Sequence, residues 1–492
     1  MNNKLSAGLN KTKTWIVKNM ATILFTVLSI VCIIISEKQL GDIGAQVVER
    51  FARNTCLVLA LIIPCLAGLG MNFGIVVGAM AAQISIFFVV HYGGTGITGF
   101  LICALVSTPL AIIFGYLLGL IFNKTKGAEM IAGLIFGFFA DGIYRLFTLY
   151  IMGSVFLKDS PLILPRGFGL RNTYQLKGNI GSALNSLNFY IVLRCIFVLL
   201  MVAAVVSIFT NLKTKAVPLY KNLVKLIGGA VGLGLTFVLP LVPALDDILG
   251  GKNLVLSEVL PIFAVLAIVY FLVKLIETKI KDKKAPILKY IVLIAAFAVV
   301  FGLTFIPIVE KTLKWVKVTA GSYAIIVLFC LFNNWIVNTK LGQNMRTVGQ
   351  SRAVATSAGI NVNRTRIIAT CISTVLAAWG QLIYLQDIGT FNTVQQQSNV
   401  GLYAVAAILV GGASAKKATN KQAVLGVILF HTLFVAAPLA AEKIVGDPAI
   451  AEYIRMFILY GAIAVSLAMH AYNGGKKKAK KKAVEASVSE AE

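Results

Sequence analysis

Two charged side chains, Asp141 and Arg145, lie one helical turn apart inside an apolar stretch of the sequence. A charge at a lipid-facing helix centre costs about 2.5–3.5 kcal/mol, whereas a local pair of this spacing returns only about 0.3–0.5 kcal/mol in water. We therefore expect the pair to face protein or a wet cavity. Two interpretations stay open: a structural pair that holds neighbouring helices together, or part of a path for a solute.

Glycines and amides interrupt apolar sequence at two further places. The first is GLGMNFG at 68–74, and the second is GGAS from 411, which ends a short apolar run. An uncharged turn of this kind belongs within the membrane region, where its freed backbone groups line a cavity or are buried in protein. Such breaks point to a transport pathway, with a tight turn between packed helices as the alternative. The residues expected along a path are Gly70, Asn72, Gly74, Gln83, Gly411 and Gly412.

Motifs for catalysis are absent from the sequence. It contains no GxxxxGK[ST], HExxH or GxSxG motif, and its seven cysteines form no CxxC. Its three histidines are widely separated, so no metal site is predicted. Small residues at helical spacing instead predict close helix packing. These are the pairs Gly74/Gly78, Gly115/Gly119 and Gly133/Gly137.

A long polar loop, 339–366, runs TKLGQNMRTVGQSRAVATSAGINVNRTR between two apolar stretches. It carries five basic residues and no acidic one. Its length and polarity exceed what a connection needs. The loop is therefore interpreted as a surface that touches a partner, and a solvated connector is the alternative.

The composition is that of an integral membrane protein. Hydrophobic residues make up 58% of the chain and charged residues 13%, and the mean hydropathy is +0.86. A soluble protein of this length could not cover so much apolar surface. The net charge of +26 lies in short connectors between apolar stretches, where membrane orientation explains it better than nucleic-acid binding.

About fourteen apolar segments are long enough to be considered as spans, although the segment 399–412 is short for crossing alone. With a cytoplasmic amino terminus, the cytoplasmic connectors hold more than twice as many Lys and Arg as the external ones. The predicted fold is an all-α polytopic membrane protein with both termini in the cytoplasm. The segments are approximately 20–36, 54–70, 72–90, 97–121, 128–152, 190–210, 226–245, 255–277, 286–309, 320–338, 364–386, 399–412, 423–440 and 450–472.

The stretch from Arg346 to Val362 resembles the cytoplasmic coupling region of ABC importer permeases. The class that it resembles carries branched-chain amino acids, ribose and other simple sugars, and nucleosides. Three further stretches agree with this class in the same order: GLGMNFGIVVGAMAAQ near residue 70, TKGAEMIAGLIFGFF from Thr125, and LYAVAAILVGGAS from Leu402.

The resemblance implies that the loop docks on a separate cytoplasmic ATPase, which binds ATP and Mg, while this chain needs no cofactor of its own. It also implies an extracytoplasmic solute-binding protein, a second permease subunit in a homo- or heterodimer, and a place in the bacterial cell membrane. The residues implied in ATPase coupling are Arg346, Gly349, Ala353, Ala355, Ala358, Gly359 and Ile360.

The resemblance is expected to fail between about 190 and 309, where four apolar segments are added to the ten of the family. Because four is an even number, the coupling loop stays cytoplasmic. Arg166 and Arg171, in the long external loop, are predicted to dock the binding protein. The predicted division is 1–19 cytoplasmic segment, 20–189 first half with external loop 153–189, 190–309 inserted spans, 310–472 second half with coupling loop 339–366, and 473–492 basic tail, expected to be disordered.

The sequence thus predicts the permease subunit of an ATP-driven importer, with no covalent chemistry of its own. Its solute is expected to be a simple sugar or nucleoside, with a branched-chain amino acid as the other class. An ion-coupled secondary transporter is the main alternative. A membrane-embedded transferase is disfavoured because no acidic metal-binding cluster is visible, and a structural scaffold because it leaves the polar loop unused.

Overall fold

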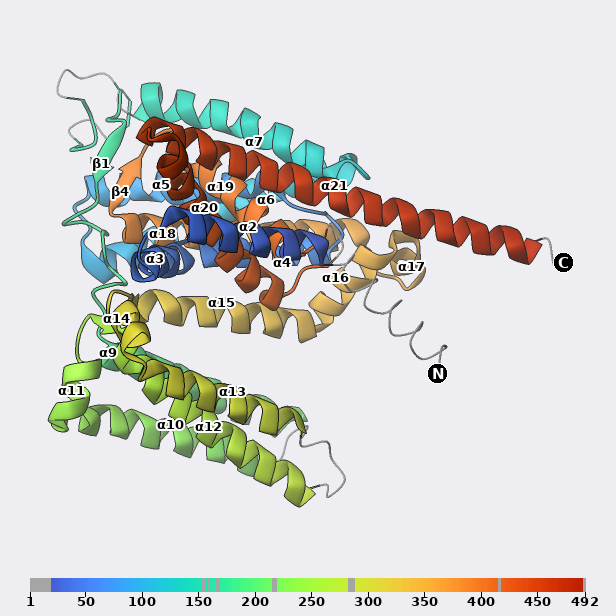
Figure 1. The fold of residues 1–492 in the computed structure, drawn as a ribbon. Helices are drawn as coiled ribbons and strands as arrows, with labels where there is room; N and C mark the ends of the chain where they lie inside the picture. Colours follow the sequence, from blue (N-terminus) through green and yellow to red (C-terminus); the bar gives the residue numbers. More distant parts are fainter. Residues whose placement is uncertain are drawn as a thin grey trace. The chain divides into compact units, whose positions relative to one another are not determined.

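The chain folds into two compact units, shown in the computed structural model of Figure 1. Unit 1 takes in Met1–Lys38, Arg50–Ala183 and Ile325–Glu492, and unit 2 takes in Gln39–Glu49 and Leu184–Ala324. All predicted site residues fall in the ranges of unit 1. The residues described by the structure are 19–152, 155–156, 160–164, 169–214, 219–281, 288–414 and 417–489.

Unit 1 is a bundle of helices, and two of its helices, α3 and α15, are divided between the units. A single 3-10 turn, η1 (Phe73–Ile75), precedes α5, and a π-helical turn, η2 (Phe147–Ile151), follows α7. The helices are α2 (Met20–Ser36), α3 (Leu40–Ala60), α4 (Ile62–Leu66), α5 (Val76–His91), α6 (Gly96–Lys124), α7 (Glu129–Leu146), α15 (Ala320–Asn338), α16 (Lys340–Gln350), α17 (Arg352–Ser357), α18 (Val362–Ile388), α19 (Gln396–Val410), α20 (Asn420–Val445) and α21 (Pro448–Ser489).

The centre of unit 1 is helix α18, which packs against both α5 and α6. Glycines allow these backbones to approach closely. A Cβ atom added at Gly78 would lie 2.5 Å from the carbonyl oxygen of Thr374, and one added at Gly115 would lie 2.2 Å from its Oγ1. The predicted packing role of these small residues is therefore confirmed.

Unit 2 consists of two helix pairs, in which α9 packs on α10 and α12 packs on α13. Short strands β2 (Asn253–Val255) and β3 (Lys317–Thr319) pair antiparallel, with Leu254 opposite Val318. The predicted insertion, 190–309, lies inside unit 2, but its status as an insertion stays a prediction. The helices of the unit are α9 (Phe189–Thr214), α10 (Leu219–Val238), α11 (Pro243–Leu249), α12 (Leu256–Lys281), α13 (Leu288–Thr304) and α14 (Pro307–Lys314).

Nine helices in the described part of the chain are long and apolar enough to cross a membrane. The number rises to ten if α13 and α14, which bend by 84°, form one span. Two further apolar helices, Met20–Ser36 and Leu226–Leu241, are shorter. The membrane class and helical fold are confirmed, whereas fourteen crossings and the cytoplasmic side of both termini stay predictions.

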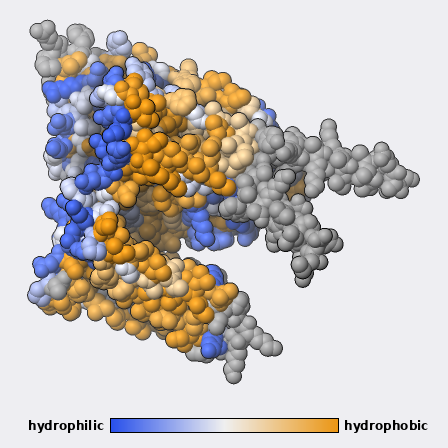
Figure 2. Space-filling view, in the orientation of Figure 1, coloured by the Kyte–Doolittle hydropathy of each residue, from blue (hydrophilic) through white to orange (hydrophobic). Residues whose placement is uncertain are grey.

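The buried share of each apolar helix separates interior helices from helices that face outward. In α5, 83% of the apolar window is buried inside the protein, but in α9 and α12 the buried share is only 11%. Figure 2 shows apolar side chains over the flanks of unit 1 and polar side chains at the end that carries β1 and β4. Helices α5 and α18 therefore form the interior, and helices such as α9 present their apolar sides outward.

Short strands close the predicted external end of unit 1. Strand β1 (Thr173–Gln175) pairs antiparallel with β4 (Thr390–Asn392), with Tyr174 opposite Phe391. The backbone N–H of Gly96 donates to the carbonyl of Asn179 at 2.8 Å. The predicted external loop is thereby attached to the ends of α6 and α18.

The final helix, α21, differs from the prediction for the tail. Its backbone stays helical from Pro448 to Ser489, through the basic segment for which the sequence predicts disorder. Lys, Ala and Glu dominate this segment, and all three are strong helix formers.

Candidate functional site

The predicted coupling loop folds into two short helices, α16 and α17, and a turn at 358–361 then leads into α18. A residue whose side chain caps the helix directly precedes each of the three: Thr339, Ser351 and Asn361. Each cap accepts a hydrogen bond from the backbone N–H three residues further on, at 3.3, 3.4 and 2.9 Å respectively. Caps of this type each stabilise a helix start by about 1 kcal/mol. The segment 339–361, called the coupling segment below, therefore consists of two capped helices and the turn that follows them.

A glycine turn ends α17 and directs the chain into α18. Gly359 has φ of +73°, a conformation that favours glycine. Its N–H donates to the carbonyl of Thr356 at 3.0 Å, and the N–H of Ile360 donates to the carbonyl of Ala355 at 2.9 Å. These two bonds form a Schellman motif, which fixes the reversal of the chain.

The outward face of α17 is made of small side chains. Ala353, Ala358 and Gly359 are exposed, and a Cβ atom at Gly359 would meet no atom within 4 Å. Val354 is the largest apolar side chain on this face, with 59% of its surface exposed. Ile360, which the sequence suggested as an anchor, is half-buried. The exposed face is flat and suited to close approach by a partner.

The inward face of the coupling segment carries Ala355, which is fully buried, and Gly349. A Cβ atom at Gly349 would lie 2.2 Å from the carbonyl oxygen of Leu66, and one at Gly68 would lie 2.8 Å from the Cα of Gly349. Gly68 itself has φ of +71°. Only glycine fits at both positions, so α16 is in direct backbone contact with the break that follows α4.

A buried carboxylate ties the coupling segment to the corner between α6 and α7. Glu129 accepts hydrogen bonds from Arg352 and from Arg366, the latter at 2.5 Å, and from the N–H of Gly127 at 3.0 Å. Arg366 is fully buried and also donates to the carbonyl of Phe122 at 2.9 Å. One acid thus holds α17, α18 and the start of α7 together.

The break between α4 and η1, residues 67–72, is buried or half-buried in protein. The sequence predicts that the backbone groups of this break either line a cavity or are buried in protein, and the structure shows burial. Gly70 has φ of +74°, and Gly74 lies against Leu118 of α6. Asn72 is 1% exposed, and neither atom of its amide has a hydrogen-bond partner among the described residues.

Two more buried amides lie beyond the break, on α5 and α18. Gln83 and Gln381 are both fully buried, and neither amide has a partner within the described part of the chain. An unpartnered buried amide costs about 1–3 kcal/mol, so these groups are candidates for contact with a solute. Gln381, which the sequence analysis missed, shares these properties with Asn72 and Gln83, and a role of all three in a path stays a prediction.

The pair Asp141 and Arg145 connects helix α7 to helix α19. Arg145 and Asp141 form an ion pair at 2.7 Å. The other carboxylate oxygen of Asp141 accepts from Nε2 of Gln397 at 2.6 Å and from Oγ of Ser398 at 3.3 Å. These contacts are those that the structural interpretation predicts. A role in a solute path stays a prediction.

The second glycine site, Gly411-Gly412, lies where α19 turns into the segment before α20. A Cβ atom at Gly411 would lie 2.0 Å from the carbonyl oxygen of Gln422, and Gly412 has φ of +80°. Nε2 of Gln422 donates to the carbonyl of Gly412 at 2.7 Å. The geometry fits the tight turn between packed helices that the sequence analysis kept as an alternative.

The two predicted docking arginines lie in the external loop. Arg166 falls outside the described residues. Arg171 is exposed, its Nε donates to the carbonyl of Ile163 at 3.4 Å, and its own carbonyl accepts from Thr393 at 2.7 Å. The docking of a binding protein at Arg171 stays a prediction.

Two residues that the sequence analysis missed share one signal. Glu129 and Arg366 are charges beside or inside apolar segments, as Asp141 is, and the same cost of burial applies to them. Their sequence positions differ by more than two hundred residues, so no local spacing shows that they meet. The sequence analysis also missed Val354, because a valine carries no charge and its exposure is visible only in the structure.

Comparison with known proteins places the chain in a family. A family model described as "Branched-chain amino acid transport system / permease component" matches residues 199–467, which is more than half of the chain. The chain belongs to this family. The predicted resemblance to ABC importer permeases is therefore confirmed, and the protein is a multi-pass membrane permease.

Two curated relatives match over a short stretch of this permease. The "Autoinducer 2 import system permease protein LsrC" of Klebsiella pneumoniae is 32% identical over 91 residues, which cover 18% of this chain and 26% of the relative. The protein of the same name from an Enterobacter species is 33% identical over 90 residues, with the same two shares. The chain thus matches about a quarter of the length of these relatives, and no solved structure matches it.

The matched interval bears on the predicted insertion. It includes most of 190–309, where the resemblance was expected to fail. Whether the spans of 190–309 are inserted into the family's set therefore stays a prediction.

Proposed function

We propose that this permease is the membrane-spanning subunit of an ATP-driven importer for a small polar solute. A simple sugar or a nucleoside is the first expectation, and a branched-chain amino acid is the second. The family match and the names of the two relatives, both permeases of an import system, support this proposal.

The observation that carries the proposal is the contact of Gly349 with the break at Leu66–Gly68. Four residues after Gly68, the chain reaches Asn72, whose buried amide has no partner among the described residues. A partner that moves α17 therefore moves α16, because Ser351 joins the two helices directly. Movement of α16 is then passed to the break without an intervening side chain.

This arrangement supports an alternating-access cycle. In the proposed cycle, an ATPase grips the exposed face around Val354, and ATP binding and hydrolysis move the coupling segment. The break and the amides of Gln83 and Gln381 change their exposure from one side of the membrane to the other. Glu129 keeps the coupling segment attached to α6 and α7, so that these helices move together with it.

The proposal includes partners and a site of action. ATP and Mg are bound by the cytoplasmic ATPase, and this chain holds no cofactor. A solute-binding protein docks outside, against the loop that contains Arg171, and a second permease subunit completes the path. The protein acts in the bacterial cell membrane, with the coupling segment on the cytoplasmic side.

An ion-coupled secondary transporter remains the alternative function. Such a transporter needs a titratable group that is free to exchange ions within the spans. Asp141, the acid deepest in a predicted span, is engaged by Arg145, Gln397 and Ser398. These contacts favour the ATP-driven importer.

Copurification tests the proposed function. Tagged permease extracted from its native membrane is expected to bring down a subunit with Mg-dependent ATP hydrolysis. Val354→Arg, which adds bulk and charge to the flat face of α17, is expected to lose that subunit and solute uptake together. Gly359→Arg, at the open glycine of the turn, has the same expected result.

Gln343→Arg is the matched control, since Gln343 is exposed but belongs to α16 and not to α17. It is expected to keep both the ATPase subunit and uptake. The proposal is wrong if the wild-type chain yields no ATPase while uptake survives in Gly359→Arg.

A further inference from the structure

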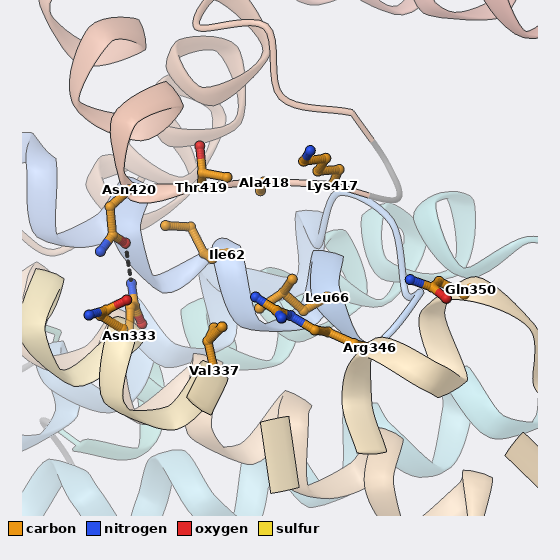
Figure 3. A pocket seen from close by; sticks show the side chains of 11 residues that line it. Ile62, Leu66, Asn333, Val337, Arg346, Gln350, Lys417, Ala418, Thr419 and Asn420 are labelled. Atoms are coloured by element: carbon orange, nitrogen blue, oxygen red, sulfur yellow. Dashed lines mark hydrogen bonds between the residues drawn. The ribbon is translucent and has the colours of Figure 1, made fainter. Parts of the chain in front are cut away.

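A cavity of about 490 Å³ opens beside the coupling segment in unit 1 (Figure 3). Its volume lies in the range of about 300–1,000 Å³ that is usual for small-molecule sites. Four separate segments of the chain build its walls. The residues that line it are Ile62 and Leu66 of α4, Asn333, Asn334 and Val337 of α15, Arg346 and Gln350 of α16, and Lys417, Ala418, Thr419 and Asn420 before and at the start of α20.

The cavity is positively charged. Arg346 and Lys417 line it from different segments, and none of the described residues that line it is acidic. Both side chains are exposed, and neither forms an ion pair with any residue that the structure describes. Figure 3 shows the guanidinium of Arg346 extending from α16 into the cavity, with Lys417 at its rim. Two unpaired cations in a concave site attract an anion.

Amide groups surround the two cations. Nδ2 of Asn333 donates to the carbonyl of Leu59 at 3.0 Å and to Oδ1 of Asn420 at 3.4 Å. Oδ1 of Asn333 is buried and has no partner in the described part of the chain, and the residue is only 1% exposed. An acceptor of this kind is suited to a hydroxyl donor. The amides of Asn334 and Gln350 are exposed at the same cavity.

The amides of the proposed solute path do not belong to this cavity. Asn72, Gln83 and Gln381 are buried elsewhere and do not line it. A path for a neutral sugar or nucleoside has no need of two unpaired cations. The cavity is therefore separate from the path in both position and chemistry.

We propose that the cavity binds a small phosphorylated sugar from the cytoplasm, and that the bound ligand slows transport. Arg346 and Lys417 hold the phosphate, and Asn333 with its neighbouring amides holds hydroxyl groups. This inference rests on the proposed function in two respects: that the cavity opens to the cytoplasm, and that the bound ligand slows transport. The binding site itself rests on this chain alone.

The position of the cavity explains the effect on transport. A bound ligand bridges α16 of the coupling segment, α4 just before the break, and the segment that follows Gly412. In the proposed cycle, α16 and α4 must move. A ligand that favours one arrangement of these walls slows the exchange between states. Import then slows as phosphorylated sugar accumulates inside.

Calorimetric titration of the full-length chain in lipid nanodiscs, without any ATPase, tests the site. Glucose 6-phosphate is expected to bind, inorganic phosphate to bind at least tenfold more weakly, and glucose to give no signal. Arg346→Gln and Lys417→Gln are each expected to weaken glucose 6-phosphate binding at least tenfold, because each removes one charge-assisted contact. Both residues are exposed, so the variants are expected to fold.

Lys421→Gln is the matched control, since it removes a cation four residues from Lys417 that does not line the cavity. It is expected to bind glucose 6-phosphate as the wild type does. Equal binding in Arg346→Gln, Lys417→Gln and the wild type overturns the proposal, as does no binding of glucose 6-phosphate or phosphate to the wild type.

A second outcome separates this proposal from the proposed function. If Arg346→Gln loses a copurifying ATPase while the wild-type chain binds neither phosphate probe, the cavity is a docking pocket and the proposal is wrong. If the chain binds glucose 6-phosphate but no ATPase copurifies, the site stands and the ATP-driven function fails. Glucose 6-phosphate enclosed in proteoliposomes with the whole importer is expected to lower uptake at least twofold.

Discussion

At the scale of single residues, the charges of this permease differ most in how deeply they are buried. Glu129 meets two arginines, but 36% of the side chain of Arg352 is exposed and none of that of Arg366 is. A partly exposed ion pair contributes about 0–1 kcal/mol, whereas removal of one partner from a buried pair costs about 3–5 kcal/mol. The same carboxylate is therefore a weak partner for one arginine and a necessary partner for the other.

Glu129→Gln is expected to lower the free energy of unfolding by about 3 kcal/mol, because Arg366 is left buried with its charge uncompensated. Arg352→Gln is expected to lower it by no more than about 1 kcal/mol. Tryptophan fluorescence of the detergent-solubilised protein during denaturation measures both changes. Equal losses in the two variants would show that burial does not set the strength of this cluster.

The pair Asp141 and Arg145 separates a structural role from a transport role. The double variant Asp141→Asn, Arg145→Gln keeps an oxygen that accepts from Gln397 and removes both charges. We expect uptake per folded molecule to stay within about twofold of the wild type, with a lower midpoint of thermal unfolding, because the ion pair is lost. Initial uptake rates in membrane vesicles, divided by the amount of folded permease, measure this. A collapse of uptake with unchanged thermal stability would assign the pair to the path.

At the scale of elements, the junction between α16 and the break after α4 is the contact on which coupling depends. No side chain lies between Gly349 and the backbone at Leu66 and Gly68. A backbone contact of this kind transmits small displacements directly, since packed interiors leave no free volume to absorb them.

Gly349→Ala is expected to uncouple transport from ATP hydrolysis. Its methyl group would lie 2.2 Å from the carbonyl oxygen of Leu66, so α16 must move away from the break. We expect the ATPase to copurify as before, because α17 keeps its outward face, while solute uptake falls at least tenfold. Uptake and ATP hydrolysis in proteoliposomes measure the two effects.

Gly461→Ala in α21 is the matched control for this substitution, since its methyl group would meet no atom within 4 Å. It is expected to leave uptake and ATP hydrolysis unchanged. Normal uptake in Gly349→Ala would remove the junction from the coupling mechanism.

The bounds of the helices were predicted well where hydropathy alone defines a helix. They were predicted less well where contacts with other parts of the protein define it. The predicted segment 128–152 matches α7 and its π-helical turn, which span Glu129–Ile151. The predicted start at residue 54 is late, because α3 begins at Leu40 with an amphipathic stretch that a hydropathy scan passes over. The caps Thr339 and Ser351 could have been predicted from residue type and position. The contact of Gly68 with Gly349 could not, because it depends on how distant segments dock.

At the scale of the whole molecule, the two ends of unit 1 carry different features. The coupling segment, the break and the corner at Glu129 gather through their mutual contacts. At the other ends of α6, α7 and α18, the connecting loops are held together by the pairing of strands β1 and β4. The excess of basic residues in the predicted cytoplasmic connectors favours the assignment that places the coupling segment in the cytoplasm, and this assignment stays a prediction.

Thiol labelling of intact cells tests this assignment of sides. In a background without the seven native cysteines, Tyr92→Cys, in the connection between α5 and α6, is expected to react with a membrane-impermeant maleimide from outside. Val354→Cys is expected to react only after permeabilisation. Both positions are highly exposed, at 79% and 59%, so neither is protected by its own fold. Reaction of Val354→Cys in intact cells would place the coupling segment outside, and an external segment cannot be moved by a cytoplasmic ATPase.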